Sequence, residues 1–438
     1  MLTTLKNAFK IKEIRQRILF TFLMLVVIRI ASQLPVPGVN RDYFSSWFAA
    51  QTGDAFNFFD AFTGGSFLNM SIIALNITPY ITSSIIIQLL TIAIPKLEEM
   101  QRDGEDGRKK MVAITRYVTV ALSLIESAAM AIGFGRQGLL QTYNAFNVIT
   151  VICALTAGSA FLMWIGERIT EKGIGNGISI VLTINIISRM PAEMNALIEQ
   201  FVAGKNVATA VVAVVIIFAV IIAMIVLVVI LNNAVRRIPV QYAKKVQGRK
   251  MVGGNSSNIP LKVNTSGVIP VIFASSIMQF PVIICSLLGY NGGTSVWGHI
   301  LKGLSSSNWC KPSEPIYSIG LLVYILLVIF FAYFYTSITF NPLEISENMK
   351  KQGGFIPGIR PGKPTSEYLT RILNYVIFIG AVGLTIVCVI PFVFSGVFNA
   401  SVSFGGTSLI IIVSVIVETL KQIESRMLVR NYKGFLND

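Results

Sequence analysis

Ten long apolar runs occupy most of this chain and constrain it to fold within a membrane. A helix needs about 20 apolar residues to cross the hydrocarbon core of a bilayer. Most of the runs approach or exceed that length, and 53% of all residues are hydrophobic while only 13% are charged. The chain is therefore predicted to be an all-α polytopic membrane protein. The predicted spans are Ile18–Leu34, Ile72–Ile94, Val112–Phe134, Phe146–Gly166, Ile174–Met190, Val207–Leu231, Gly267–Leu288, Ile316–Ile338, Ile372–Phe394 and Thr407–Ile423.

The basic residues indicate how these spans are oriented, because cytoplasmic loops carry an excess of Lys and Arg. With the N-terminus placed inside, 29 of the 36 Lys and Arg residues fall on the inner side and six on the outer side, while Arg29 lies within the first span. Since the number of spans is even, both termini are predicted to be cytoplasmic. The net charge of +15 is then read as a topology signal and an inner docking face, and not as a sign of DNA binding.

The spans divide into two equal groups, five before Arg189 and five after Lys205. An odd number of spans in each group makes the two groups run in opposite directions, as in inverted-topology repeats. We therefore predict an N-terminal half, residues 1–190, and a C-terminal half, residues 191–438. A site or a pore is expected at the interface between them.

The segment Phe56–Met70 is apolar but too interrupted to cross a bilayer, since it contains Asp60, Gly64 and Gly65. We predict a short re-entrant helix that enters the membrane and stops. Broken backbone at membrane depth is tolerated only where protein or a water-filled cavity surrounds it, so a hollow in the membrane is implied. An amphipathic loop lying on the membrane surface explains the same residues equally well.

The predicted spans hold few ionisable residues, which argues against the common classes of solute transporter. Ion-coupled transporters and proton relays use Asp, Glu, His or Lys near the middle of the membrane. Only Glu126 lies deep within a span, and it is expected to pair with Arg29 or with a backbone donor. The single histidine, His299, falls in an outer loop. An ion-coupled secondary transporter is kept as the alternative hypothesis, because the number and predicted arrangement of spans suit that class too.

Sequence motifs of catalysis and metal binding are absent. The chain has no HExxH, no Walker loop and no paired catalytic carboxylates, and its four cysteines lack ligand or redox spacing. We therefore predict no catalytic residue, no metal and no cofactor. A membrane-embedded hydrolase is disfavoured for the same reason.

Two inner loops are longer than a connection requires, residues 232–264 and residues 341–371. The first contains seven basic residues and no acidic one, and the second is rich in Gly and Pro around Arg360. Long loops in compact proteins are usually functional or disordered. Anionic lipid, the phosphates of ribosomal RNA and an acidic protein surface are all candidate partners for a basic inner loop.

Several long motifs together carry a resemblance to a known family. They are ITPYITSSIIIQLLT, DGEDGRKK, ITEKGIGNGISI, RRIPVQYAKKVQGRK, NPLEISENMKKQGGFIPGIRPGKPT and FGGTSLIIIVSVIVE. The chain resembles the SecY family, the channel-forming subunits of the bacterial Sec protein translocase. The resemblance implies a channel in the plasma membrane that passes unfolded secretory polypeptides outward and releases transmembrane segments sideways into lipid. It also implies the partners SecE, SecG, the SecA ATPase, the ribosome and signal-sequence-bearing preproteins, and no chemical reaction by the chain itself.

The resemblance assigns roles to residues at matching positions. It implies an hourglass pore between two five-helix halves, closed by an apolar ring and a plug. The implied pore ring is Ile77, Ile81, Leu182, Ile186, Ile272 and Ile411, with Leu182 where related chains carry Ile. The implied plug occupies about residues 55–70 and includes Phe58, Phe59, Phe62, Gly64, Gly65 and Ser66.

The resemblance also implies a lateral gate to lipid and an inner docking face. The gate is expected between the second and seventh spans, with the third and eighth beside them. Its polar residues are Ser83, Ser84, Gln88, Ser275, Ser276 and Gln279, for which ordinary helix packing is the competing interpretation. The implied contacts to SecA or the ribosome are Arg236, Arg237, Lys244, Lys245, Arg249, Lys250 and Arg360, the last needed for motor-driven export.

Overall fold

The computed structural model of this chain describes residues 9–50, 60, 63–201, 207–242, 245–247, 250–252, 256–287, 296–312, 314–398 and 406–434. Each predicted span coincides with a helix in this part of the chain. These helices are α2 (Lys12–Ala31), α5 (Thr78–Ala93), α7 (Gly104–Phe134), α8 (Ala145–Lys172), α9 (Gly177–Phe201), α10 (Val207–Asn233), α11 (Ile269–Leu287), α13 (Ile319–Thr339), α15 (Lys363–Phe398) and α16 (Gly406–Gly434).

Shorter elements connect the long helices. The helical ones are α3 (Arg41–Ala50), α6 (Pro95–Arg102), η1 (Gly135–Leu139), α12 (Val296–Leu304), η2 (Ser306–Asn308), η3 (Pro315–Ser318) and α14 (Pro342–Lys351). The strands are β1 (Val235–Tyr242), β2 (Lys245–Gln247), β3 (Lys250–Val252), β4 (Ser256–Lys262) and β5 (Gly354–Phe355).

Five helices of the described chain are long and apolar enough by themselves to cross a membrane. The five spans contain α7, α8, α10, α13 and α15. A sixth candidate is the pair α5 and α6, which is bent by 105° at its break. The remaining long helices are shorter or carry charged ends, and they lie packed among the first five. The chain is a multi-pass membrane protein.

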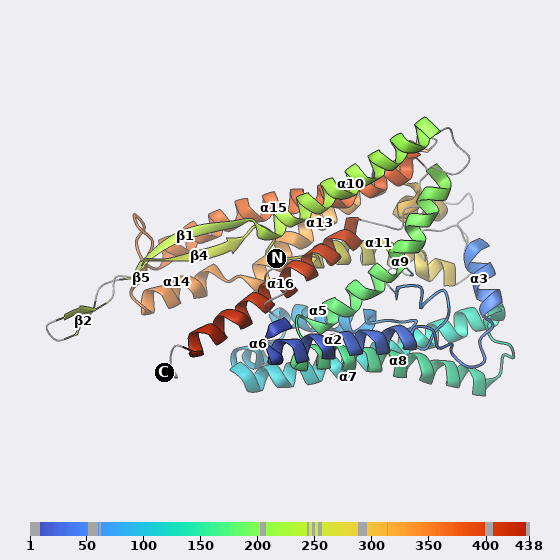
Figure 1. Cartoon of the computed structure of the whole chain (residues 1–438), viewed down its shortest axis with the longest axis horizontal. Helices are drawn as coiled ribbons and strands as arrows, with labels where there is room; N and C mark the ends of the chain where they lie inside the picture. The colour runs from blue at the N-terminus through green and yellow to red at the C-terminus, as the bar shows by residue number, and fades with distance from the viewer. Residues whose placement is uncertain are drawn as a thin grey trace.

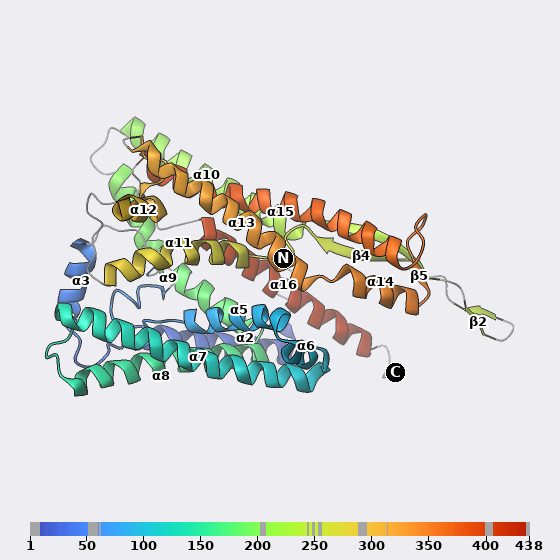
Figure 2. The same cartoon turned by 180° about the vertical axis from the view of Figure 1, so that it is seen from behind.

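The long helices form two bundles with two helices between them (Figures 1 and 2). In one bundle α2, α5, α7 and α8 pack together, and in the other α10, α11, α13 and α15 do so. Helix α9 contacts α8 of the first bundle and α10 of the second. Helix α16 contacts α9, α10 and α15, so the two bundles are joined through α9 and α16.

The start of α2 and the end of α16 lie at the same end of the molecule (Figure 1). Ile14, Ile174 and Ile423 form one apolar cluster there, which includes the loop before α9. In that loop, the backbone N–H of Gly175 donates to Oε1 of Gln422 at 3.0 Å. The described chain thus begins and ends on one side, as an even number of spans requires.

Helix α9 is longer than the span predicted at Ile174–Met190. It continues through Pro191 to Phe201, so the predicted boundary between the two halves falls inside a helix. The predicted span ended at Met190, directly before Pro191, a residue type that often interrupts a helix. Arg189 instead lies on α9, with its side chain largely buried.

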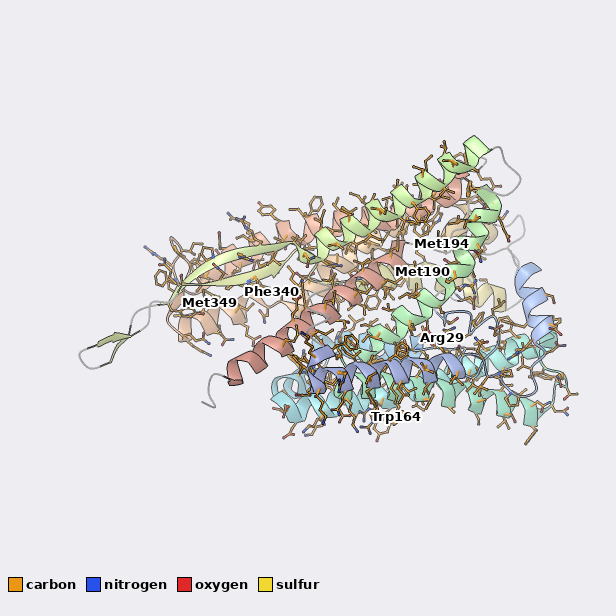
Figure 3. All side chains as sticks on the ribbon, viewed as in Figure 1. Arg29, Trp164, Met190, Met194, Phe340 and Met349 are labelled. Carbon is orange, nitrogen blue, oxygen red and sulfur yellow. The ribbon has the colours of Figure 1, made fainter. Side chains whose placement is uncertain are left out.

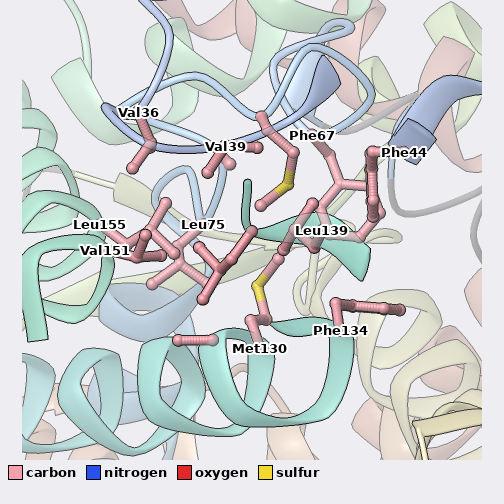
Figure 4. Packing of buried hydrophobic residues seen from close by; sticks show 14 residues of the cluster. Val36, Val39, Phe44, Phe67, Leu75, Met130, Phe134, Leu139, Val151 and Leu155 are labelled. Carbon is pink, nitrogen blue, oxygen red and sulfur yellow. The ribbon is translucent and has the colours of Figure 1, made fainter. Parts of the chain in front are cut away.

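The first bundle has a core of its own at the end where α7 stops and α8 begins (Figure 4). Phe44 of α3 packs edge-on against Phe67 and Phe134, with ring centroids 5.4 and 5.5 Å apart. Leu139 and Leu155 complete this cluster from η1 and α8. Phe67 belongs to the predicted re-entrant segment, so the end of that segment is built into the core of the first bundle.

The inner loops contain a small antiparallel sheet that the sequence did not predict. Strand β1 pairs with β4 along its length, with Ile238 opposite Ile259, and its end pairs with β5 from the second long loop. Ile238, Val240 and Leu261 are buried against Met349 of α14. The two loops predicted as separate segments, residues 232–264 and 341–371, therefore form one folded unit that projects from the bundles (Figure 1).

Candidate functional site

The six aliphatic residues of the predicted pore ring lie in one apolar cluster. The cluster contains Ile77 and Ile81 at the start of α5, Leu182 and Ile186 on α9, Ile272 on α11, and Ile411 on α16. Four of them are buried, and Ile81 and Ile272 are partly buried. Helices α9, α11 and α16 meet near the middle of the molecule in Figure 1, where the first bundle faces the second.

Local helical geometry explains how the residues on α5 reach this cluster. The backbone N–H of Ile81 donates to the carbonyl of Ile77 at 3.1 Å, which places the two side chains one turn apart on one face. Pro79 lies in the first turn of α5, where its missing N–H costs no helical hydrogen bond. Leu182 and Ile186 are spaced in the same way on α9 and are both buried.

A cluster of branched aliphatic side chains can serve as a deformable constriction. Such a constriction excludes water and ions when it is empty, because its lining offers no hydrogen bonds. It also carries no charge that would retain or repel a particular passing group. This chemistry suits a long and variable substrate better than a small polar solute.

Among the described residues of the predicted plug, Asp60 and Thr63 are helical, and residues 64–70 are turns that precede α5. Gly64 and Gly65 have φ of +66° and +83°, and Ser66 is buried. Phe58, Phe59 and Phe62 lie outside the described residues. The short helix predicted at 55–70 is thus described only in part, at residues 60 and 63–70, and the second part of the segment, residues 64–70, consists of consecutive turns.

A buried polar contact holds the junction between these turns and α5. Asn185 of α9 donates from Nδ2 to Oδ1 of Asn76 at 2.9 Å. Asn76 has φ of +53°, and its carbonyl accepts a hydrogen bond from Ser159 of α8. Sequence reasoning missed this contact, although asparagine within an apolar run was a signal for it.

Arg29 of α2 takes part in the same contact (Figure 3). Its Nη1 donates to Oδ1 of Asn185 at 3.4 Å. Arg29 was one of two partners expected for Glu126, the other being a backbone donor, and the guanidinium of Arg29 instead reaches α9, whereas Glu126 lies on α7. Arg29 instead supports the asparagine that holds Asn76.

The predicted gate residues occupy different surroundings. Ser83 of α5 is buried, donates to the carbonyl of Thr115 at 2.7 Å and accepts from Thr119, so it joins α5 to α7. Ser275 of α11 is buried too and donates to the carbonyl of Val271 on its own helix. These hydrogen bonds tighten packing within each side and do not link α5 to α11.

The other gate residues lie nearer the surface. Ser84 is partly buried and Ser276 is exposed, while only the backbone of Gln279 is described. Gln88 of α5 is exposed, and its side chain lies near that of Tyr335 of α13, which the sequence did not indicate. This contact joins the second span to the eighth, across the line where the two bundles meet.

The predicted inner contacts lie on the folded unit made by the two long loops. Arg236 and Arg237 on β1 are exposed, and so is Arg360 between β5 and α15. The carbonyl of Arg360 accepts from the hydroxyl of Thr365 at 2.8 Å, which fixes the backbone beneath the exposed side chain. Lys245 and Lys250 begin β2 and β3, and Lys244 and Arg249 lie outside the described residues.

An apolar cavity of about 170 Å³ lies between α9, α10, α15 and α16. It is lined by aliphatic, aromatic and methionine side chains, among them Met194 of α9, which is labelled in Figure 3. A cavity with no polar lining offers nothing to bind an ion or a polar solute. Among the described residues, no three His, Cys, Asp or Glu side chains come together as a metal site.

Comparison with known proteins gives consistent results over the whole chain. The family model described as SecY matches residues 71–420. The protein translocase subunit SecY of Halalkalibacterium halodurans is 42% identical over 443 residues, which cover 100% of this chain and 100% of that protein. These findings confirm the resemblance drawn from the motifs.

Solved structures show the same fold at low sequence identity. One is a SecY structure concerned with how the plug domain stabilises the closed state of the translocation channel, with a TM-score of 0.60 and 19% identity over 94% of this chain and 92% of that one. Another is Sec61 in the canine ribosome-channel complex from the endoplasmic reticulum, with a TM-score of 0.58 and 18% identity over the same shares of the two chains.

Proposed function

The chain belongs to the SecY family of protein translocase subunits, and we propose on that premise that it forms a channel for unfolded secretory polypeptides across the bacterial plasma membrane. The observation that carries this proposal is the apolar cluster formed by Ile77, Ile81, Leu182, Ile186, Ile272 and Ile411. A constriction of aliphatic side chains seals against water when empty and deforms around a passing chain of any sequence. The chain itself makes and breaks no bond in this function.

The energy for movement comes from partners at the inner face. We assign this role to SecA or the translating ribosome, with SecE and SecG as the small subunits of the complex. The exposed Arg236, Arg237 and Arg360 provide positive charge on a folded unit that projects from the bundles. Such a surface can bind ribosomal RNA phosphates or an acidic protein face. Both termini are cytoplasmic in this arrangement, which the shared position of the ends of α2 and α16 supports.

The two halves, residues 1–190 and 191–438, part along a gate in the proposed mechanism. Helices α5 and α7 form one side of this gate, and α11 and α13 form the other. A signal sequence that enters between the sides opens a path to lipid, so an apolar segment partitions sideways while polar chain passes outward. The side chains of Gln88 and Tyr335 lie near each other across this line and separate when the gate opens.

The re-entrant segment is the proposed plug of the resting channel. Its described residues lie beside α9, and a short stretch composed mostly of turns, residues 71–76, leads from them to Ile77 of the apolar cluster. A segment in that place fills the path on the outer side of the ring. Its displacement by an entering polypeptide would open the path without unfolding either bundle.

Reconstitution tests the proposed function directly. Proteoliposomes containing the chain with SecE and SecG are given SecA, ATP and an unfolded preprotein, and protease-protected preprotein is measured. Photocrosslinkers at positions 81 and 272 are expected to label a stalled preprotein, whereas one at Ile149 on the exposed face of α8 is not. ATP-dependent protection without labelling at either ring position would refute the assigned ring. Uptake of a small solute along an ion gradient, with no preprotein movement, would support the transporter hypothesis instead.

A further inference from the structure

A carboxylate within the re-entrant segment is fully buried and paired with a cation on another element. Asp60 is 0% exposed, and its Oδ2 forms an ion pair with Nη1 of Arg189 on α9. The other oxygen of the same carboxylate accepts the backbone N–H of Leu68 at 2.9 Å. Asp60 therefore ties the turns of the re-entrant segment to each other and to α9.

Arg189 has a second acidic neighbour that belongs to its own helix. Its Nε lies 3.7 Å from Oε1 of Glu193, one turn further along α9. When the re-entrant segment is in place, Arg189 contacts two carboxylates. When the segment leaves, Glu193 still accompanies Arg189, so the cation is not left alone in a partly buried position.

The re-entrant segment also fits α9 by shape, one turn from the ion pair. A Cβ added to Gly64 would lie 2.7 Å from the carbonyl oxygen of Asn185 and 2.9 Å from the hydroxyl of Ser188. Gly64 also has φ of +66°, which other residues rarely adopt. The absence of a side chain at this position thus allows the segment to lie directly on the α9 backbone.

We propose that Asp60 and Arg189 form a latch that holds the re-entrant segment closed against α9, with Glu193 as the partner that retains Arg189 when the latch opens. The proposal extends the proposed function, because it takes the re-entrant segment to be the plug of a protein channel. Charge and shape have separate roles in it. Gly64 sets where the segment rests, and the ion pair sets how firmly it stays.

The latch makes a specific prediction about the resting channel. Asp60→Asn keeps the size of the side chain and an oxygen that can accept from Leu68, but it removes the charge that binds Arg189. We expect the ion conductance of channels without preprotein to rise about tenfold, because loss of one partner from a buried ion pair strongly weakens the closed arrangement. Arg189→Gln is expected to act in the same direction, and Arg189→Lys to retain most of the seal.

Two further variants separate a latch from a general loss of structure. Because Asp60 and Arg189 act through each other, Asp60→Asn combined with Arg189→Gln is expected to leak no more than the worse single variant. Glu193→Gln leaves the pair between Asp60 and Arg189 intact and is expected not to raise the resting conductance. Arg168→Gln removes an exposed ion pair with Glu171 at the inner end of α8 and serves as the matched control.

The experiment uses the complete reconstituted complex in planar bilayers, with conductance measured before and after addition of SecA, ATP and preprotein. If the wild type translocates preprotein, and channels with Asp60→Asn or Arg189→Gln are as tightly sealed as the wild type, the latch is overturned. The proposed function then still stands. Fully additive leak in the double variant would also overturn it, since the residues would then act separately. Failure of the wild type to translocate would count against the proposed function itself.

Discussion

Nδ2 of Asn185 lies 2.9 Å from Oδ1 of Asn76 in a fully buried contact between α9 and the last turn before α5. The contact sits at the one place where the second span changes from turns to helix. Ile77, the next residue, belongs to the apolar cluster and is the first residue of the predicted pore ring. A single hydrogen bond therefore helps to set where the proposed pore lining begins.

Substitutions of Asn76 separate the hydrogen bond from the backbone conformation. Asn76→Gly removes only the side chain and should destabilise the protein by roughly 1–3 kcal/mol, because Asn185 loses a buried partner. Asn76→Ala should cost about 1 kcal/mol more, since a residue with Cβ is strained at φ of +53°. Thermal unfolding of the purified complex in detergent measures both. An equal loss for the two variants would show that the backbone conformation contributes nothing.

The apolar cluster makes a prediction about ion conductance. Asparagine at both Ile81 and Ile272 introduces hydrogen-bonding groups into the proposed constriction, so water enters and resting conductance should rise by about tenfold. Relaxed selectivity for signal sequences should accompany the leak, because the closed state loses its seal. Planar bilayer recordings of the reconstituted complex measure the first effect, and export of a preprotein with a weakened signal sequence measures the second.

Ile165 of α8 provides the control for this prediction. It is fully buried in the same cluster but supports the predicted ring from behind and is not part of it. Ile165→Asn should lower the yield of folded protein while the surviving channels conduct as the wild type does. Equal conductance from both sets of variants would mean that the ring has been assigned to the wrong side chains.

The sequence predicted the positions of the long helices because hydropathy records burial in lipid residue by residue. It did not predict the sheet of the inner loops, since β1 is basic and contains Pro239, and its buried Ile238 and Val240 gain partners only through folding of distant segments. Arg189 and Pro191 likewise read as the end of a span, although α9 continues to Phe201. In each place the local signal was correct, but contacts between distant residues decided the structure.

The contacts of the re-entrant segment were hidden for a related reason. Asp60 was visible in the sequence as a break in an apolar run, but nothing in its neighbourhood indicates which cation it meets. That information depends on how far α9 extends and on which face it turns toward the segment. The predicted ring residues came from a family resemblance, because a single aliphatic residue in a membrane protein carries no sequence signal that distinguishes a pore ring from an ordinary core.

The contact between Gln88 and Tyr335 makes a prediction about the gate. Tyr335→Phe removes the hydroxyl that lies near Gln88 of α5 and keeps the aromatic ring. Loss of a polar contact of this kind should cost the closed gate about 0.5–1.5 kcal/mol, which corresponds to a 2- to 13-fold shift toward the open gate. Export of a preprotein with a defective signal sequence should increase accordingly.

Tyr333 is the matched control on the same helix. Its hydroxyl donates to the carbonyl of Asn374 at 3.3 Å, and so joins α13 to α15 within one bundle. Tyr333→Phe also removes one hydroxyl from α13, but without touching the proposed gate, and export should stay unchanged. If both variants relax the signal requirement alike, the effect comes from a general loosening of α13 and not from the gate.

Arg360 makes the last prediction, which concerns the inner face. Its side chain is exposed while its backbone is held by Thr365, so Arg360→Glu reverses a surface charge without disturbing packing. The variant should fold and insert normally, with a thermal unfolding temperature close to that of the wild type, yet lose nearly all SecA-driven export. Arg426→Glu on α16 makes the same charge change at the same end of the molecule and should export normally. Normal export by Arg360→Glu would show that the motor does not need this arginine. An equal loss in both variants would show that bulk charge, and not this arginine, governs the action of the motor.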